Sequence, residues 1–231
     1  MPRLELISIG KIAYEPMVRI QEKRHADVVA GHTDDALFLL EHSDVVTLGK
    51  NSSSENVLLS NTDLKRVGVE LFQSSRGGDV TYHGPGQMVA YPIIHLRADE
   101  RDIRKFVYRL EEILIRTCAD FGIIGQRVEG LRGIWVGKEK IAALGVRVAR
   151  WTTMHGVALN VSTDLTKFSC IVPCGIKDRG VTSIQKLLGE APPMVEVMDI
   201  FSRHAGVVLG RETYIHQHLS SLDQPKTEVH I

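Results

Sequence analysis

The segment RGGDVTYHGPGQ, residues 76–87, places four glycines within ten positions, at 77, 78, 84 and 86. Glycine adopts positive φ readily and lets the backbone approach a ligand closely, and free amides in such a segment can bind an oxyanion or an anionic group. Two tight turns between strands would explain the glycines equally well. The polar and amphipathic side chains of the same segment favour a binding role, and they are Arg76, Asp79, Thr81, Tyr82, His83 and Gln87.

The residues around this segment predict strands and one helix. Apolar and alternating runs predict strands at 4–10, 35–42, 45–49, 68–75 and 86–96. Residues 15–29 are predicted to form a helix, with Pro16 tolerated in its first turn. The runs at 35–42 and 45–49 are expected to pair as a hairpin. The Ser- and Asn-rich stretch 50–63 is predicted to be a mobile loop.

Residues 102–121 carry the clearest helical pattern of the chain. Asp102 is placed to cap this helix and Gly122 to end it. Its expected buried stripe comprises Ile103, Phe106, Val107, Leu110, Ile113, Leu114, Cys118 and Phe121. Antiparallel strands are predicted at 132–137, 140–150 and 154–161, followed by an amphipathic helix at 193–209 whose inward residues include Met194, Val197, Met198 and Phe201.

Composition narrows the class of protein. The chain has 231 residues, 43% of them hydrophobic, and a formal net charge of +0. Such a chain can bury a sizeable core, and its charge balance argues against bulk electrostatic binding to nucleic acid or a membrane. We find neither a signal peptide nor a run long enough for a membrane span, and expect a cytoplasmic protein. The simplest organisation is a single domain over 1–215 with a C-terminal tail at 216–231.

Two of the three cysteines lie in FSCIVPCGIKDRG, residues 168–180. Zinc sites usually combine pairs of closely spaced ligands, so Cys170 and Cys174 predict no metal site. A disulfide is not expected in a reducing compartment. Cys174 lies between Pro173 and Gly175, where a turn can expose a thiol, so it is favoured over Cys170 as a nucleophile.

GKEKIAALG, residues 137–145, begins with a predicted turn that contains Lys138. Lys140 follows at the start of a strand, and on its own such a lysine is most often solvated. Gly145 inside this strand suggests a close approach of backbone or ligand. His155 and Gly156 are interpreted as a break between strands, with at most a minor role for His155.

Four blocks of the sequence together resemble the octanoyltransferases of the lipoate biosynthesis protein B family. They are RGGDVTYHGPGQ, KIAALGVRV, MHGVALNV and IVPCGI, in this order, and the resemblance covers roughly residues 5–210. It implies an α/β (α+β) fold of the biotin/lipoate protein ligase type, with a mixed, largely antiparallel sheet and flanking helices. It also implies an acyltransferase that moves an octanoyl group from acyl carrier protein to a lysine of a lipoyl domain.

The resemblance further implies the site. Cys174 would carry the octanoyl group as a thioester, and Lys140 would be the second catalytic residue. Neither a metal nor ATP is expected, since the donor is octanoyl-phosphopantetheine on acyl carrier protein. The acceptors would be lipoyl domains of 2-oxoacid dehydrogenase complexes and the glycine cleavage H protein. The implied substrate-binding residues are Arg76, Gly77, Gly78, Asp79, Val80, Thr81, Tyr82, His83, Ala143, Leu144, Gly145, Gly156, Val157 and Ala158.

Three other functions remain open at this point. An ATP-dependent lipoate or biotin ligase on the same fold would have a lysine comparable to Lys140, but its glycine-rich signature ends in His-Asp where this chain has His83-Gly84. A related octanoyltransferase family carries its cysteine elsewhere. A catalytically silent carrier-binding module would not need both Lys140 and Cys174. Arg101, Arg104, Lys105 and Arg109 form either a docking face for an acidic carrier or an ordinary solvated face.

Overall fold

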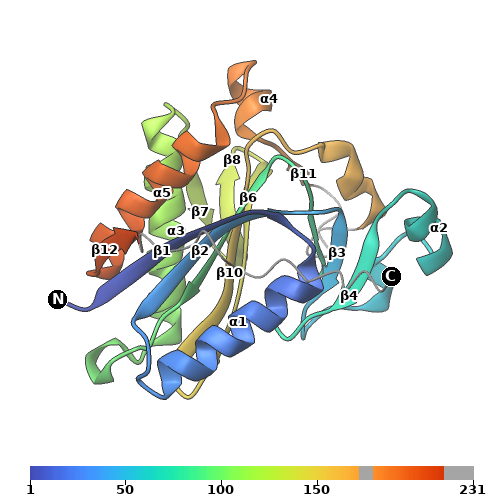
Figure 1. Ribbon diagram of the computed structural model, residues 1–231. Coiled ribbons are helices and arrows are strands. Elements are labelled where there is room, and N and C mark those ends of the chain that lie inside the picture. Colours follow the sequence, from blue (N-terminus) through green and yellow to red (C-terminus); the bar gives the residue numbers. More distant parts are fainter. Residues whose placement is uncertain (172–178, 216–231) are drawn as a thin grey trace, which may run out of the picture.

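The computed structural model describes residues 1–171 and 179–215, and its helices flank a large sheet (Figure 1). Cys174 and the predicted tail at 216–231 lie outside the described residues. The main sheet has the strand order β12-β1-β2-β6-β10-β9-β8-β7, with β11 paired to β9. Its strands are β1 (Arg3–Ile12), β2 (Asp35–His42), β6 (Gln87–Ile93), β7 (Gln126–Val128), β8 (Leu131–Val136), β9 (Glu139–Ala149), β10 (Thr152–Asn160), β11 (Gly180–Val181) and β12 (Glu212–Ile215).

Most neighbours in this sheet are antiparallel. The parallel pairs are β1 with β12, β1 with β2, and β11 with β9. The predicted mixed, largely antiparallel sheet is therefore confirmed. A second, smaller sheet has the order β4-β3-β5 and comprises β3 (Val45–Leu48), β4 (Glu70–Gln73) and β5 (Thr81–His83).

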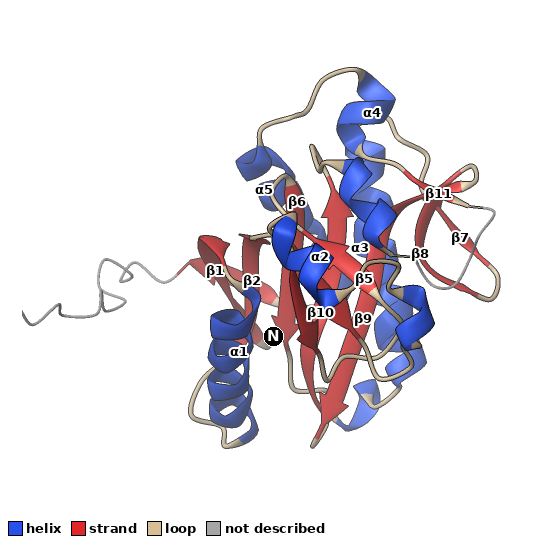
Figure 2. Ribbon diagram, turned by 90° about the vertical axis from the view of Figure 1, so that its right-hand side faces the viewer, coloured by secondary structure: helices blue, strands red, loops and turns tan. Residues whose placement is uncertain are grey.

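Helices cover both faces of the main sheet (Figures 1 and 2). Leu37 and Leu39 of β2 face the core with α3 and α5, whereas Phe38 and Leu40 face the core with α1. The helices are α1 (Tyr14–Val29), α2 (Asn61–Arg66), α3 (Ile103–Asp120), α4 (Ile184–Leu188) and α5 (Met194–Leu209), with short 3₁₀ turns η1 (Ser54–Asn56), η2 (Ala98–Glu100) and η3 (Leu165–Cys170).

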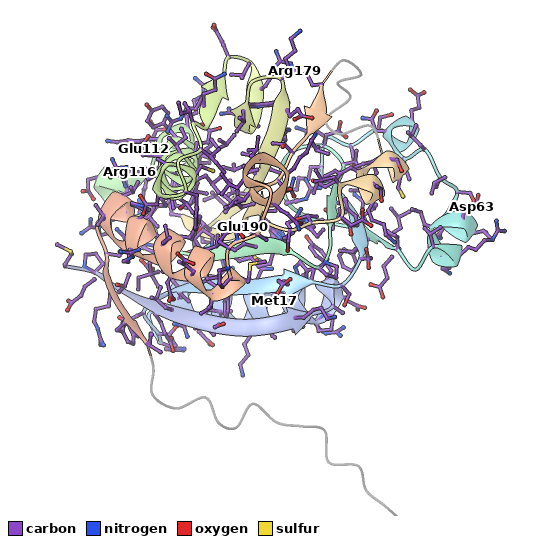
Figure 3. All side chains as sticks on the ribbon, turned by 90° about the horizontal axis from the view of Figure 1, so that it is seen from above. Met17, Asp63, Glu112, Arg116, Arg179 and Glu190 are labelled. Carbon is purple, nitrogen blue, oxygen red and sulfur yellow. The ribbon has the colours of Figure 1, made fainter. Side chains whose placement is uncertain are left out.

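The long helix α3 follows its sequence pattern closely. Asp102 caps it by accepting a hydrogen bond from the Lys105 amide (3.0 Å), as predicted. Ile103, expected on the buried stripe, is instead 45% exposed and is the first residue of the helix. On the solvent side Arg116 donates to Glu112 (2.9 Å; Figure 3).

The predicted hairpin between residues 35–42 and 45–49 is wrong. Both strands form, but β2 pairs with β1 and β6, while β3 pairs with β4 and β5. Both edges of β2 are therefore occupied, so the chain after it must leave the main sheet. The Tyr82 hydroxyl donates to Asp44 (2.6 Å) in this connection and ties it to β5.

Residues 50–63 are also more regular than the predicted loop. They contain η1 and the first turn of α2. Ser60 caps α2 by accepting from the Asp63 amide (3.1 Å), a capping interaction that the predicted loop did not include. Within the described part of the chain, no helix is both long and apolar enough to cross a membrane.

Arg211 anchors the end of α5 through two buried carboxylates. It donates to Asp35 (2.9 Å) and to both oxygens of Glu100 (2.8 and 2.9 Å), and all three residues are buried. Removing one partner from a buried ion pair leaves an uncompensated charge. We expect Arg211→Ala to lower the free energy of unfolding by about 3 kcal/mol, measured by urea denaturation.

Arg19→Ala is the matched control for this prediction. Arg19 pairs with Glu15 at 2.8 Å, but both side chains are mostly exposed. An exposed pair of this kind contributes about 0.3–0.5 kcal/mol. Equal losses of stability in the two variants would show that the Arg211 cluster is no stronger than a surface pair.

Candidate active site

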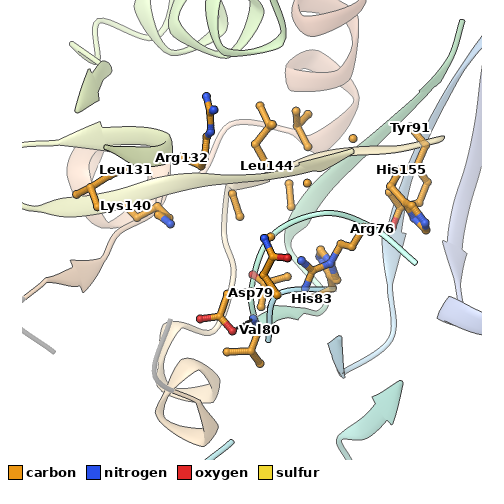
Figure 4. A pocket seen from close by; sticks show the side chains of 18 of the residues that line it. Arg76, Asp79, Val80, His83, Tyr91, Leu131, Arg132, Lys140, Leu144 and His155 are labelled. Carbon is orange, nitrogen blue, oxygen red and sulfur yellow. Dashed lines mark hydrogen bonds between the residues drawn. The ribbon is translucent and has the colours of Figure 1, made fainter. Parts of the chain in front are cut away.

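A cavity of about 280 Å³ lies between the centre of the main sheet and the segment that leads into β5 (Figure 4). Lys140 stands at one end of it, Tyr91 and His155 stand at the other, and Leu144 lies between them. Its volume is near the lower end of the range for small-molecule sites, about 300 Å³. The residues that line it and were implied by sequence are Arg76, Gly78, Asp79, Val80, Thr81, His83, Lys140, Ala143, Leu144, Gly145, Gly156, Val157 and Ala158.

Two of the implied residues do not line this cavity. Because side chains alternate along a strand, Tyr82 points away from its neighbours Thr81 and His83, and it packs against Phe168 in a separate core. Burial and the adjacent Asp44 carboxylate raise the pKa of the Tyr82 hydroxyl, so it stays neutral. Gly77 lies beside the cavity, and its amide donates to the carbonyl of Val146 (3.0 Å). That amide is therefore already engaged and is a poor candidate for an oxyanion donor.

The glycine-rich segment packs directly against β9, and β10 approaches β6 just as closely. A Cβ atom on Gly145 would lie 2.7 Å from the Gly77 carbonyl oxygen, and one on Gly156 would lie 2.2 Å from the Ala90 carbonyl oxygen. The close backbone approach predicted at Gly145 is thus present. The segment 76–87 is also not a pure pair of turns, since it contains the whole of β5.

Arg76 fastens this segment to the second sheet. Its guanidinium donates to the Thr47 carbonyl (2.7 Å) and to the Thr47 hydroxyl (2.8 and 3.1 Å), and the side chain is buried. A further bond reaches the Gly77 carbonyl (3.1 Å). Arg76 therefore holds the cavity wall in place and brings a positive charge to it.

The end of the cavity away from Lys140 is walled by buried aromatic and imidazole rings. His83 pairs with Gln87 (2.7 Å), and His42 pairs with the Tyr91 hydroxyl (2.8 Å). Burial lowers the pKa of His42 to about 4, and it lowers the pKa of His83 well below the usual value. Both imidazoles are consequently neutral near pH 7, and of the two only His83 lines the cavity, while His42 is bonded to the lining residue Tyr91.

His155 was interpreted as part of a break between strands, and this was wrong. It lies in the middle of β10 with a φ of 58°, which a non-glycine residue rarely adopts. Its amide donates to Gln21 (2.9 Å), and its ring contacts the Ser75 hydroxyl (3.1 Å). Burial, together with Arg76, lowers the pKa of His155 to about 3. The residue is therefore a neutral part of the cavity wall rather than a turn residue.

Lys140 is buried, 7% exposed, and not the solvated lysine that its type alone would suggest. Its backbone pairs with Val181 of β11, and its carbonyl accepts from the Thr182 amide (3.0 Å). Lys138, in the β8–β9 turn, is exposed. The lysine predicted to be catalytic is thus the one that reaches the cavity.

Cys174 itself lies outside the described residues, but segments on both sides of it are placed. Ile171 bridges to Val57, and Gly180 pairs with Glu139, the neighbour of Lys140. The other two cysteines are buried: Cys170 is 5% exposed and Cys118 is fully covered. Burial raises the pKa of the Cys118 thiol to about 12, which makes it unreactive near neutral pH.

Sequence reasoning missed seven residues of the cavity. Gly130 comes from the β7–β8 connection, and Leu131 and Arg132, the first residues of β8, lie at the end that holds Lys140. The remaining ones are Tyr14, Asn51, Tyr91 and His155. A buried aromatic in a strand or at a helix start gives no local signal that distinguishes a cavity wall from a core position.

Comparison with known proteins places the chain among enzymes of lipoate metabolism. Residues 13–206 match the family model of the lipoyl protein ligase A/B catalytic domain. An octanoyltransferase of Caldicellulosiruptor bescii is 48% identical over 209 residues, covering 90% of this chain and 92% of that protein. An octanoyltransferase of Solibacter usitatus is 48% identical over 199 residues, covering 86% and 90%.

Solved structures resemble the chain in fold. Lipoate-protein ligase A bound with ATP superimposes with a TM-score of 0.72 at 17% identity, covering 95% of this chain and 90% of that one. The bipartite lipoate protein ligase of Thermoplasma acidophilum gives a TM-score of 0.73 at 15% identity, covering 95% and 89%. The predicted lipoate protein ligase-type fold is confirmed.

Proposed function

Because the chain belongs to the lipoyl protein ligase A/B catalytic domain family and is an octanoyltransferase, we propose that it carries the octanoyl group as a thioester on Cys174. The acceptor is a lysine of a lipoyl domain, and the proposed donor is octanoyl-phosphopantetheine on acyl carrier protein. We propose lipoyl domains of 2-oxoacid dehydrogenase complexes and the glycine cleavage H protein as acceptors. The proposed compartment is the cytoplasm, where a reducing environment keeps Cys174 a thiol.

One observation carries this proposal: a buried lysine, Lys140, stands at one end of a cavity with a largely apolar wall. Val80, Leu144 and Val157 contribute to that wall. Burying the seven carbons beyond the carbonyl of an octanoyl group contributes about 5 kcal/mol, at about 0.8 kcal/mol for each methylene. The apolar wall therefore suits the acyl chain, and we propose that its reactive carbonyl lies at the end of the cavity that holds Lys140.

The first proposed step forms the acyl-enzyme. The Cys174 thiolate attacks the thioester carbonyl of the donor, and the carbon–sulfur bond to phosphopantetheine breaks as the tetrahedral oxyanion collapses. The departing thiolate takes up the proton that the cysteine lost. An ammonium at Lys140 favours the cysteine thiolate by opposite charge and can relay this proton.

The second proposed step forms the amide. The ε-amine of the acceptor lysine attacks the acyl-cysteine, the carbon–sulfur bond breaks, and the proton of the amine passes to the released Cys174 sulfur. Thioester exchange is nearly balanced and amide formation from a thioester is downhill. The reaction as a whole therefore needs no nucleotide and no cofactor.

We expect octanoyl transfer from acyl carrier protein to a lipoyl domain to proceed in nucleotide-free buffer. The measurement is the intact mass of the lipoyl domain after incubation with octanoyl-acyl carrier protein, with the enzyme treated to remove bound nucleotide. The matched control supplies free octanoate with ATP and Mg²⁺, and we expect no product from it. Product that appears only in the ATP reaction would identify an ATP-dependent ligase instead.

A further inference from the structure

One buried indole, that of Trp135, contacts two cationic side chains beside the active-site cavity. The Lys140 ammonium lies 4.8 Å from the centre of the Trp135 ring system, and the Arg179 guanidinium carbon lies 5.1 Å from it. Trp135 is only 2% exposed, and Lys140 only 7%. Both distances are within the range of about 6 Å in which a cation is attracted to an aromatic face, and such contacts are stronger when desolvated.

An irregularity in the β8–β9 pairing places the indole beside the lysine. Ile134 is opposite Ala142, but the next residue, Trp135, is opposite Lys140, so Ile141 has no partner in the register. Cross-strand partners project from the same face of a sheet. The extra residue therefore aligns the Lys140 side chain with the Trp135 ring.

Gly133 makes room for this arrangement. Its φ is 100°, and a Cβ atom there would lie 2.4 Å from the Ala142 carbonyl oxygen and 3.5 Å from Cε of Lys140. A larger residue at position 133 would clash with the Ala142 carbonyl, whereas its Cβ would only touch the lysine side chain. Gly133 and Trp135, both on β8, thus lie beside the Lys140 side chain.

The ring face of Trp135, rather than its N–H group, makes this contact. Trp135 Nε1 is buried and has no hydrogen-bond acceptor within residues 1–171 and 179–215. A buried N–H without a partner costs free energy, so within the described residues the indole is held by contacts of its ring and not by a hydrogen bond. A phenyl ring can therefore provide the same contact with the Lys140 ammonium, whereas an aliphatic side chain cannot.

Arg179, the residue directly before β11, contacts the same ring. Gly180, the next residue, pairs with Glu139, and the Glu139 carboxylate is itself paired with Lys186 (2.7 Å). Arg179 is half-buried, although a charged residue next to a turn is expected to be solvated. Two cationic groups therefore contact the same aromatic ring at the end of the cavity where the reaction is proposed to occur.

We propose that Trp135 is a positioning residue, which holds the Lys140 ammonium toward the cavity through the face of its indole and shares that role with Arg179. This inference rests on the proposed function of Lys140 in octanoyl transfer. The role concerns the reacting end of the substrate and not the acyl chain, because Trp135 does not line the cavity.

The test compares Trp135→Phe with Trp135→Met, two side chains of similar volume that differ in aromaticity. For Trp135→Met we expect kcat for transfer to fall about tenfold with KM for the donor changed less than twofold, since a partly desolvated cation–π contact is lost. For Trp135→Phe we expect kcat within about threefold of the parent enzyme. Equal losses in both variants, or a loss in neither, would overturn the proposal, provided that their melting temperatures agree.

Trp151→Met is the matched control. Trp151 is the only other tryptophan of the chain, and it too contacts a cation, with Arg101 at 5.3 Å from its ring. It is 40% exposed and lies in the β9–β10 turn, away from the residues that line the cavity. We expect this variant to keep kcat unchanged, which separates the loss of a tryptophan from the loss of the Trp135 surface.

Arg179→Gln tests the shared role without disturbing the core. We expect a threefold fall in kcat in the parent enzyme and no further fall when the change is added to Trp135→Met, because the ring through which Arg179 acts is then absent. Additive losses would overturn the sharing of one surface. Full activity in Lys140→Ala would instead contradict the proposed function of Lys140, and this result can be told apart from the outcomes of the Trp135 and Arg179 variants.

Discussion

Replacing Cys174 with alanine is expected to abolish both the octanoyl adduct on the enzyme and transfer to a lipoyl domain. The proposed route passes through a covalent bond to this sulfur, and alanine offers no atom that can form it. Loss of a nucleophile typically lowers kcat by a thousandfold or more. The adduct is measured by intact mass after incubation with octanoyl-acyl carrier protein alone, and the transfer rate is measured in the presence of the acceptor.

Cys170→Ala and Cys118→Ala are the matched controls. Both cysteines are buried packing residues, and the pKa of the Cys118 thiol is raised to about 12 by burial. We expect both variants to keep the adduct, with at most a modest loss of stability from the small cavity that alanine leaves. A peptide map that locates the octanoyl group on Cys170 would contradict the assignment to Cys174.

The elements of this fold that have strong local patterns were predictable from the sequence. Helix α3 carries apolar residues every three or four positions and a capping aspartate, and the sequence placed it to within a residue at each end. Strands β8, β9 and β10 were also found, because glycines and polar turns separate them, whereas the short β7 was not predicted. In each case the period of the hydrophobic pattern is the period of the element.

The pairing of strands was less accessible. Residues 35–42 and 45–49 look like the arms of a hairpin, yet they belong to different sheets. What decides this is the presence of β1 and β6 on the two edges of β2, and both partners are remote in sequence. The sequence of a strand alone does not show how many neighbouring strands already pair with it.

The residues of the cavity also fall into those that a local sequence pattern indicates and those that only the packing of remote segments brings there. The residues found from sequence lie in three contiguous blocks whose glycines mark close backbone contacts, such as Gly145 against Gly77. Tyr14 and Tyr91 were missed because each is an aromatic residue in a regular element, and only the packing of α1 and β6 brings them to the cavity. His155 was interpreted as part of a break between strands, whereas the fold holds it at a positive φ within β10.

Replacing Lys140 with alanine is expected to move the pH dependence of Cys174 alkylation upward and to slow both halves of the reaction. An unperturbed cysteine titrates near pH 8.5. A cation about 4 Å from a thiolate contributes about 4 kcal/mol at an effective dielectric constant of 20, and each 1.4 kcal/mol corresponds to one pH unit. We therefore expect a shift of one to three pH units, measured as the rate of iodoacetamide reaction at Cys174 against pH.

Lys138→Ala is the matched control, because Lys138 lies two residues away but is exposed in the β8–β9 turn. Solvent screens such a charge, so we expect its removal to leave the profile unchanged. Arg179 is present in both the parent enzyme and Lys140→Ala, so its effect on the alkylation rate of Cys174 is common to the two pH profiles. The difference between them thus reports the Lys140 charge alone. An unchanged profile, with transfer still slowed, would remove the thiolate-stabilising role and leave Lys140 as a proton relay in the attack of the acceptor amine.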